Sequence, residues 1–120
     1  MPETDDQLED LVGQWLTLPD VADRMGVDLV AVRQLLRDRQ LVALRRGERN
    51  VLSIPAAFLD GRAVLKGLPG TLTVLADSGY RTAEAVRWLF TDDELPGSPI
   101  TALVENRGTE VRRRAQALAF

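Results

Sequence analysis

Residues 17–55 read TLPDVADRMGVDLVAVRQLLRDRQLVALRRGERNVLSIP, and this stretch decides the fold. Thr17 and Asp20 have the spacing of a capping box, so a helix should begin between them. Gly26 can adopt the positive φ that a sharp turn requires, and Asp28 can cap a second helix. The stretch therefore predicts two helices joined by a tight turn.

The second of these helices should have one apolar face and one basic face. Val32, Leu35 and Leu36 repeat at the helical spacing that marks a buried side. Arg33 and Arg37 lie one turn apart on the other side of the same helix. We expect the basic side to face solvent or a partner.

A hairpin is predicted after the second helix. Residues 41–45 and 51–54 are short apolar runs around a turn that contains glycine, and Pro55 ends the second run because it cannot donate to a strand ladder. The turn and its flanks carry three arginines, Arg45, Arg46 and Arg49. A helix-turn-helix followed by a basic hairpin, or wing, is typical of domains that place one helix in the DNA major groove.

The rest of the chain divides around this stretch. Residues 1–14 are polar and acidic, and we expect a partly disordered tail with at most one helical turn. Residues 15–66 should form the winged helix-turn-helix, and residues 67–120 a small helical domain packed on it. Helices are expected to start at Pro69, at Ser98-Pro99 and at Glu110, and Thr82 should cap a further helix. The predicted fold class is α+β, mostly α.

The composition excludes several kinds of chemistry. The 120 residues, 45% of them hydrophobic, suffice for one core of ordinary size or two small cores that lean on each other. The chain has no cysteine and no histidine, which removes disulfides, most zinc sites and every Ser-His or Cys-His nucleophile. No set of carboxylates or lysines converges in the sequence. We expect a protein that is not an enzyme and needs no metal or cofactor.

The sequence also predicts a cytoplasmic protein. No apolar run approaches the roughly 20 residues that cross a bilayer. The acidic start lacks the charged and then apolar pattern of a signal peptide.

The net charge of −3 is unevenly distributed. Residues 1–16 hold five acids and no base, residues 17–66 hold nine bases and six acids, and residues 67–120 hold six bases and seven acids. Phosphates respond to the local field, so the basic middle segment remains compatible with nucleic acid.

The chain resembles a family of actinobacterial winged helix-turn-helix proteins with a helical C-terminal domain. The best known member of that family is a mycobacterial DNA-binding protein described as a substrate of a serine/threonine kinase. The segments that carry the resemblance are Leu41–Arg46, Ile54–Pro55, Leu68–Gly70, Gly79–Arg81, Arg87–Thr91 and Val111–Gln116.

The resemblance implies that double-stranded DNA is bound through the second helix and the wing. By position, the DNA-binding residues are Arg33, Gln34 and Arg37 on the helix and Arg45, Arg46 and Arg49 on the wing. The family's kinase implies a phosphosite in the tail, where Thr4 is the only hydroxyl residue before Thr17. Val30 and Ala31 stand where base-reading helices often have Ser, Thr or Lys, so phosphate contacts should dominate.

Other interpretations remain open. Arg33 and Arg37 can belong to a solvated helix face, and residues 112–114 are spread too widely around a helix to form one basic patch. Trp15 and Trp88 sit among apolar neighbours, which favours core packing over stacking on bases.

A second function would use the C-terminal part of the chain. The segment from Trp88 to Gly108 is loosely similar to toxin-binding domains of some antitoxins, so the chain could be a protein-interaction module or an antitoxin-like repressor. Residues 67–120 would then bind a partner protein or a second copy of the chain.

Overall fold

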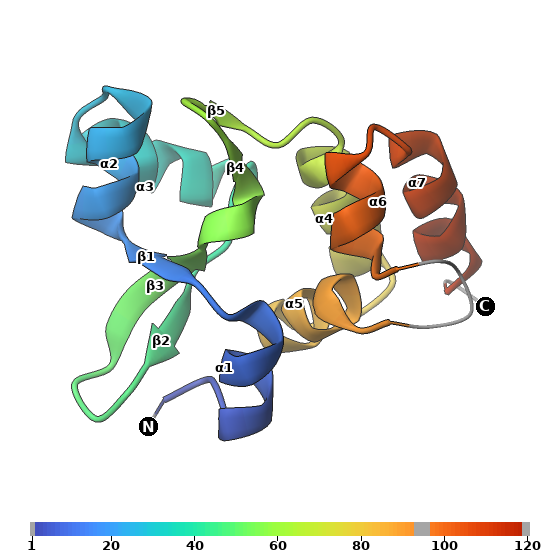
Figure 1. The fold of residues 1–120 in the computed structure, drawn as a ribbon, viewed down its shortest axis with the longest axis horizontal. Coiled ribbons are helices and arrows are strands. Elements are labelled where there is room, and N and C mark those ends of the chain that lie inside the picture. Colours follow the sequence, from blue (N-terminus) through green and yellow to red (C-terminus); the bar gives the residue numbers. More distant parts are fainter. Residues whose placement is uncertain (1, 93–96, 119–120) are drawn as a thin grey trace.

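The computed structural model describes residues 2–92 and 97–118 and has the α+β, mostly helical fold that the sequence predicts (Figure 1). The elements in chain order are α1 (Asp6–Val12), β1 (Trp15–Thr17), α2 (Leu18–Met25), α3 (Leu29–Arg37), β2 (Leu44–Arg46), β3 (Val51–Pro55), the 3-10 turn η1 (Ala56–Phe58), β4 (Leu59–Asp60), β5 (Ala63–Val64), α4 (Leu68–Asp77), α5 (Thr82–Phe90), α6 (Pro99–Val104) and α7 (Gly108–Ala117). In this part of the chain, no helix is long and apolar enough to cross a membrane.

The helix-turn-helix forms as its local signals predict. The Asp20 N–H donates to the Thr17 hydroxyl at 3.3 Å, and the Thr17 N–H donates to the Asp20 carboxylate at 3.2 Å, which closes the capping box of α2. Gly26 ends α2 with a φ of 72°, in the left-handed region. The Asp28 carboxylate then accepts the Ala31 N–H at 2.9 Å and caps α3.

The wing belongs to a three-stranded antiparallel sheet with strand order β1-β3-β2. Strand β1, which the sequence did not predict, pairs Trp15 with Pro55 and Thr17 with Ser53. Three residues show no useful alternation of polarity, so only pairing with a distant strand reveals that they form one. The predicted first wing strand starts later than expected, at Leu44.

The C-terminal helices follow most of their predicted signals. Gly79 and Tyr80 form the expected Schellman ending of α4, with the Tyr80 N–H donating to the Leu75 carbonyl at 3.0 Å. The expectation that Thr82 caps the next helix is wrong by one residue, because Arg81 is the N-cap and its N–H donates to Glu84 at 2.9 Å.

The last two helices also begin near their predicted starts. Ser98 caps α6 as expected, while α7 begins at Gly108, two residues before the predicted Glu110. Part of the acidic loop predicted over residues 91–97 lies outside the described residues.

The N-terminal segment differs from our expectation of a partly disordered tail. Residues 6–12 form a seven-residue helix, capped by the Asp5 carboxylate, which accepts the Leu8 N–H at 2.8 Å. Leu8 is 1% exposed, and α1 packs against α5. The charged partners of this segment lie far along the chain, so its own composition does not reveal them.

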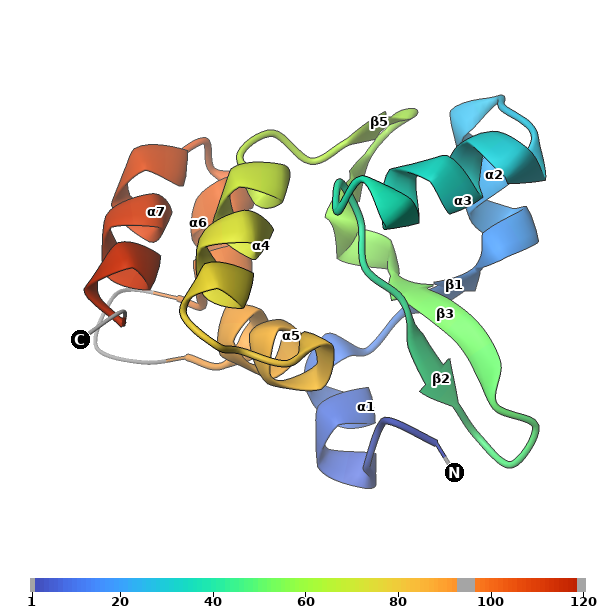
Figure 2. The same cartoon turned by 180° about the vertical axis from the view of Figure 1, so that it is seen from behind.

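The two halves of the chain share one hydrophobic core. Their buried side chains form one continuous cluster, in which Phe58 of η1 stacks on Phe90 of α5 with ring centroids 5.9 Å apart. In Figures 1 and 2, helices α4 to α7 lie at one end of the molecule, and α2, α3 and the β2–β3 hairpin lie at the other. The domain boundaries at residues 14 and 66 remain a prediction.

Candidate DNA interface

Helix α3 presents a continuous exposed stripe. Val30, Arg33, Gln34 and Arg37 are all exposed and follow one another at the spacing of neighbours on a single helix face. The opposite face carries Val32, which is fully buried. The predicted basic side of the helix therefore faces solvent.

Two residues of the stripe are ordered by hydrogen bonds along the helix. The Arg37 guanidinium donates to the Gln34 side-chain oxygen at 2.8 Å, and the Gln34 amide donates to Asp38 at 2.9 Å. These contacts hold the Gln34 amide and the Arg37 guanidinium side by side on the surface.

A groove brings the recognition helix and the wing together. Arg33 of α3 and Arg45 of β2 line the same groove, of about 290 Å³, with Leu29 and Val51 also in its walls. Figures 1 and 2 show the start of α3 and the turn of the β2–β3 hairpin on the same side, away from α6 and α7. Two of the six predicted DNA-binding residues thus meet at one concave surface.

Arg46 lies on the other face of the wing, because successive strand residues point to opposite faces. Its guanidinium lies over the Trp15 ring, 4.7 Å from the centroid, and makes a 2.7 Å ion pair with Glu9. The second Glu9 oxygen accepts the Thr4 hydroxyl at 2.9 Å. Hydrogen bonds from Arg46 and then from Thr4 lower the pKa of the Glu9 carboxyl below its ordinary value.

The N-terminal segment also lines the edge of the wing. The Glu3 N–H donates to the Arg45 carbonyl at 2.8 Å, and the Arg45 N–H donates to the Glu3 carboxylate at 2.9 Å. Because β2 is an edge strand, these bonds satisfy backbone groups that would otherwise be open to another chain.

Asp5 connects the same N-terminal segment to helix α5 of the C-terminal half. Its carboxylate pairs with Arg87 at 2.9 Å, and its pKa is lowered mainly by the Leu8 N–H and, to a smaller extent, by Arg87. The N-terminal segment thus contacts both halves of the molecule.

The six predicted residues do not converge on one point. Arg49 is exposed in the hairpin turn beside Asn50, whose φ is 51°. Arg37 lies in the last turn of α3, away from the groove that holds Arg33 and Arg45. The arrangement resembles a broad surface more than a compact site.

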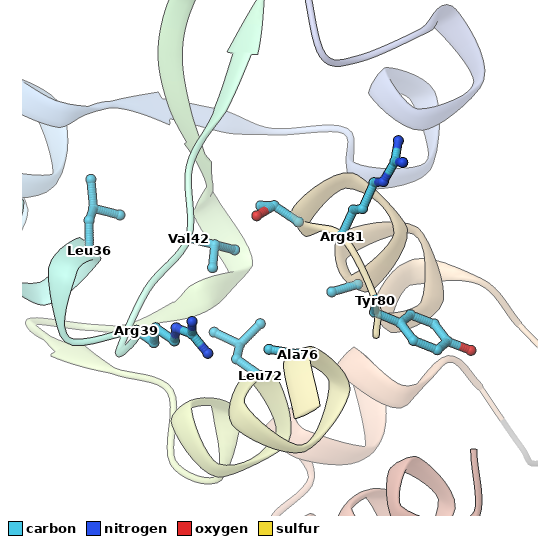
Figure 3. A pocket seen from close by; sticks show the side chains of 9 residues that line it. Leu36, Arg39, Val42, Leu72, Ala76, Tyr80 and Arg81 are labelled. Carbon is cyan, nitrogen blue, oxygen red and sulfur yellow. The ribbon is translucent and has the colours of Figure 1, made fainter. Parts of the chain in front are cut away.

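A second hollow is lined by residues of both halves of the chain (Figure 3). This pocket of about 410 Å³ has aliphatic walls that include Leu36, Val42 and Leu72. Arg39 lies beside Leu72, and the Arg81 guanidinium points away from the pocket (Figure 3). Arg39 therefore belongs to this surface between the halves and not to the groove of Arg33.

Sequence reasoning missed the residues that hold the N-terminal segment in place. Glu3, Asp5 and Glu9 belong to the segment for which the sequence predicts a partly disordered acidic tail, and no local signal pairs Arg87 with that segment. The excess of acids before residue 17 and of bases after it was the one signal that could have suggested the pairing.

The two tryptophans pack against the core, as their apolar neighbours in the sequence predict. Trp15 and Trp88 are half-buried against the core, and each faces an arginine, Arg46 and Arg114 respectively.

Among the described residues, no three acidic side chains cluster as a metal site would require.

Two protein-family models match the chain. The model described as "DNA-binding protein Rv2175c, wHTH domain" matches residues 1–59, and the model described as "Rv2175c C-terminal domain of unknown function" matches residues 65–119. A relative, the DNA-binding protein Rv2175c of Mycobacterium tuberculosis (strain ATCC 25618 / H37Rv), is 44% identical over 117 residues, which span 86% of this chain and 79% of the relative. This chain belongs to the Rv2175c family.

The fold is similar to that of a family member. The NMR structure of Rv2175c superimposes with a TM-score of 0.79 at 40% identity, over 89% of this chain and 82% of the other. The resemblance inferred from the sequence is confirmed at the level of the family. The relative and the family model over residues 1–59 are named for DNA binding and not for an enzymatic activity.

Proposed function

We propose that this protein binds double-stranded DNA and acts as a transcriptional or nucleoid regulator. Helix α3 enters the major groove through its exposed stripe, and the wing lies beside it. The observation that carries the proposal is the groove that Arg33 and Arg45 both line, since it joins the two elements that a winged helix-turn-helix uses on DNA. The name of the relative, a DNA-binding protein, supports the same conclusion.

The arginines have different roles in this proposal. Arg33 and Arg45 contact phosphates from the two walls of the groove, and Arg37 and Gln34 extend the contact along α3. Arg49 contacts the sugar-phosphate backbone of the DNA from the hairpin turn. Arg46 contributes least while Glu9 holds it, because its charge is already paired.

The salt dependence of binding tests this assignment. Each phosphate contact that is lost flattens the slope of log K against log salt concentration by about one unit. The double variant Arg33→Ala, Arg45→Ala should therefore bind random-sequence duplex more weakly, with a slope smaller by about two units. Fluorescence anisotropy at several salt concentrations measures both quantities.

A matched control separates local contacts from net charge. Arg112→Ala combined with Arg113→Ala removes the same charge from α7, at the other end of the molecule (Figure 1). The control should keep the wild-type slope. If the two double variants lose slope equally, the groove is not the DNA contact.

We further propose that phosphorylation of Thr4 by a serine/threonine kinase weakens DNA binding. The Thr4 hydroxyl lies 2.9 Å from Glu9, so a phosphate there would bring about −1.5 to −2 charges next to a carboxylate. The phosphate also competes for Arg46, which Glu9 already binds. Added negative charge beside the wing opposes the approach of DNA.

A charge substitution tests the role of Thr4. Thr4→Glu should bind the same duplex more weakly than wild type, while Thr4→Ala, which loses the hydroxyl without adding charge, should bind like wild type. Equal binding by Thr4→Glu and wild type removes the support for control by charge at this residue.

No observation favours the antitoxin-like alternative as a second function. Several apolar residues of the segment from Trp88 to Gly108 are buried in the shared core, Ile100 and Leu103 among them. A homodimer or a protein partner bound through residues 67–120 remains a prediction. The mass of the free protein in solution tests it.

A further inference from the structure

Val30 is the most exposed large apolar side chain in the described part of the chain, at 68%. It is the second residue of α3, at the end of the helix that points to the same side as the wing turn. The first residues of a recognition helix are the ones that contact base edges. A branched aliphatic side chain at this position cannot hydrogen-bond a base.

A single exposed valine would need no explanation, because folded proteins expose many apolar atoms. Here the exposed apolar residues are clustered. Six large apolar residues are exposed in the described part of the chain, and four of them lie just before α3, at its start or on β3: Val27, Leu29, Val30 and Val51. Leu29 and Val51 line the groove that also holds Arg33 and Arg45.

The chemistry of this surface selects its occupant. Arginines flank the apolar cluster and match the phosphates on either side of a DNA groove. Inside the major groove, the apolar group that a valine can contact is the C5-methyl group of thymine. Cytosine carries only a hydrogen at C5, and the purines present N7 with O6 or N6 in the major groove, so thymine is the standard base with a methyl group there.

We propose that Val30 reads the methyl group of a thymine in the major groove, so that thymine is required at one position of the bound site. This inference rests on the proposed function and adds the base that is read. Contact with the base methyl supplies sequence selectivity where α3 has no hydroxyl or amine near its start. The polar stripe of Gln34 and Arg37 lies one to two turns further along.

The experiment removes the methyl group from the DNA and the side chain from the protein. Duplexes are selected from a random-sequence library with the wild-type protein. The enriched duplex is then resynthesised with single thymines replaced by deoxyuridine, which lacks only the C5-methyl group. One replacement should lower wild-type affinity about fourfold, the factor expected when one methyl group is no longer buried.

Val30→Ala should bind the thymine duplex more weakly than wild type does, and replacing the critical thymine by deoxyuridine should not lower its affinity further. In this double-mutant cycle, the non-additivity of the two changes assigns the interaction to Val30 and the methyl group. The matched control is Val104→Ala. Val104 is 62% exposed and lies on α6, at the opposite end of the molecule. This control should keep both the wild-type affinity and the fourfold loss on uracil.

Three results would overturn the inference. The first is the absence of any enriched sequence in the selection. The second is an affinity of wild type that no uracil replacement changes. The third is a loss of DNA affinity in Val30→Ala that is equal on the thymine and uracil duplexes and is accompanied by a fall in the mass of the free protein. Val30 would then be a contact between two copies of the chain.

These results are separable from failure of the proposed function. If the protein binds random duplex with the predicted salt slope but ignores the methyl group, only the role of Val30 is lost. If it binds no duplex at low salt, the proposed function itself is wrong.

Discussion

Glu9 shows how one side chain connects two parts of this molecule. Its carboxylate accepts Arg46 of the wing on one oxygen and the Thr4 hydroxyl on the other. Both contacts are partly shielded from water, with the Glu9 and Arg46 side chains 30% and 29% exposed. An ion pair of this kind contributes about 1 kcal/mol or less to stability. Under the proposed function, the position of this ion pair matters more than its strength, because the pair competes with DNA phosphates for the Arg46 guanidinium.

The lowered pKa of Glu9 predicts a pH dependence. A group whose folded pKa is depressed stabilises the fold above its ordinary pKa and loses that contribution as the pH falls through the folded value. Glu9→Gln should therefore be less stable than wild type at pH 7, by about 1 kcal/mol or less. The difference should shrink once the pH falls below the ordinary glutamate value of 4.5.

Urea unfolding followed by tryptophan fluorescence, at pH 7 and near pH 3, measures this difference. Asp10→Asn provides a control on the same helix, with an exposed carboxylate. If Glu9→Gln lowers the free energy of unfolding equally at both pH values, the assignment of the Glu9–Arg46 ion pair is contradicted.

Among the elements, those with local signals were predictable and those with distant partners were not. The capping box of α2, the turn at Gly26, the Asp28 cap and the Schellman ending at Gly79 each depend on residues within one or two turns. Strand β1 and the short β4–β5 hairpin exist only through their pairing, and α1 only through its docking. Short sequences without strong periodicity carry little information about such partners.

The candidate site divides in the same way. Helical spacing was enough to place Arg33, Gln34 and Arg37 on one face of α3, because the period of the helix is known. It was not enough to separate Arg45 from Arg46, whose side chains face different surfaces of the wing. The predicted strand ends at Arg45, whereas β2 continues to Arg46, which pairs with Val51, so the two arginines are successive strand residues on opposite faces.

At the scale of the whole molecule, the two halves should unfold together. Phe58 is fully buried and stacks on Phe90 across the boundary, and Leu8 of α1 is buried in the same core as α5. Separating the halves would expose these side chains to water, at roughly 2 kcal/mol for each large apolar group. A shared core of this kind favours one cooperative transition.

The two tryptophans make this prediction measurable, because Trp15 belongs to the first half and Trp88 to the second. Trp88→Phe leaves a probe of the winged helix-turn-helix, and Trp15→Phe leaves a probe of the helical domain. Within each variant, the fluorescence midpoint in urea should coincide with the midpoint of far-ultraviolet circular dichroism. A fluorescence transition that clearly precedes or follows the loss of helix would show that the halves unfold independently.

The contact of Glu3 with the edge of β2 has a practical consequence for any laboratory that prepares this protein. A purification tag or fluorescent label attached to the N-terminal segment is held next to the wing by this contact, and its bulk alters the DNA affinity that is measured. Helix α7 lies at the opposite end of the molecule from the wing (Figure 2), so a tag on the C-terminal side keeps the wing edge open. Binding data from the two kinds of fusion should therefore be compared only after the leading tag has been cleaved.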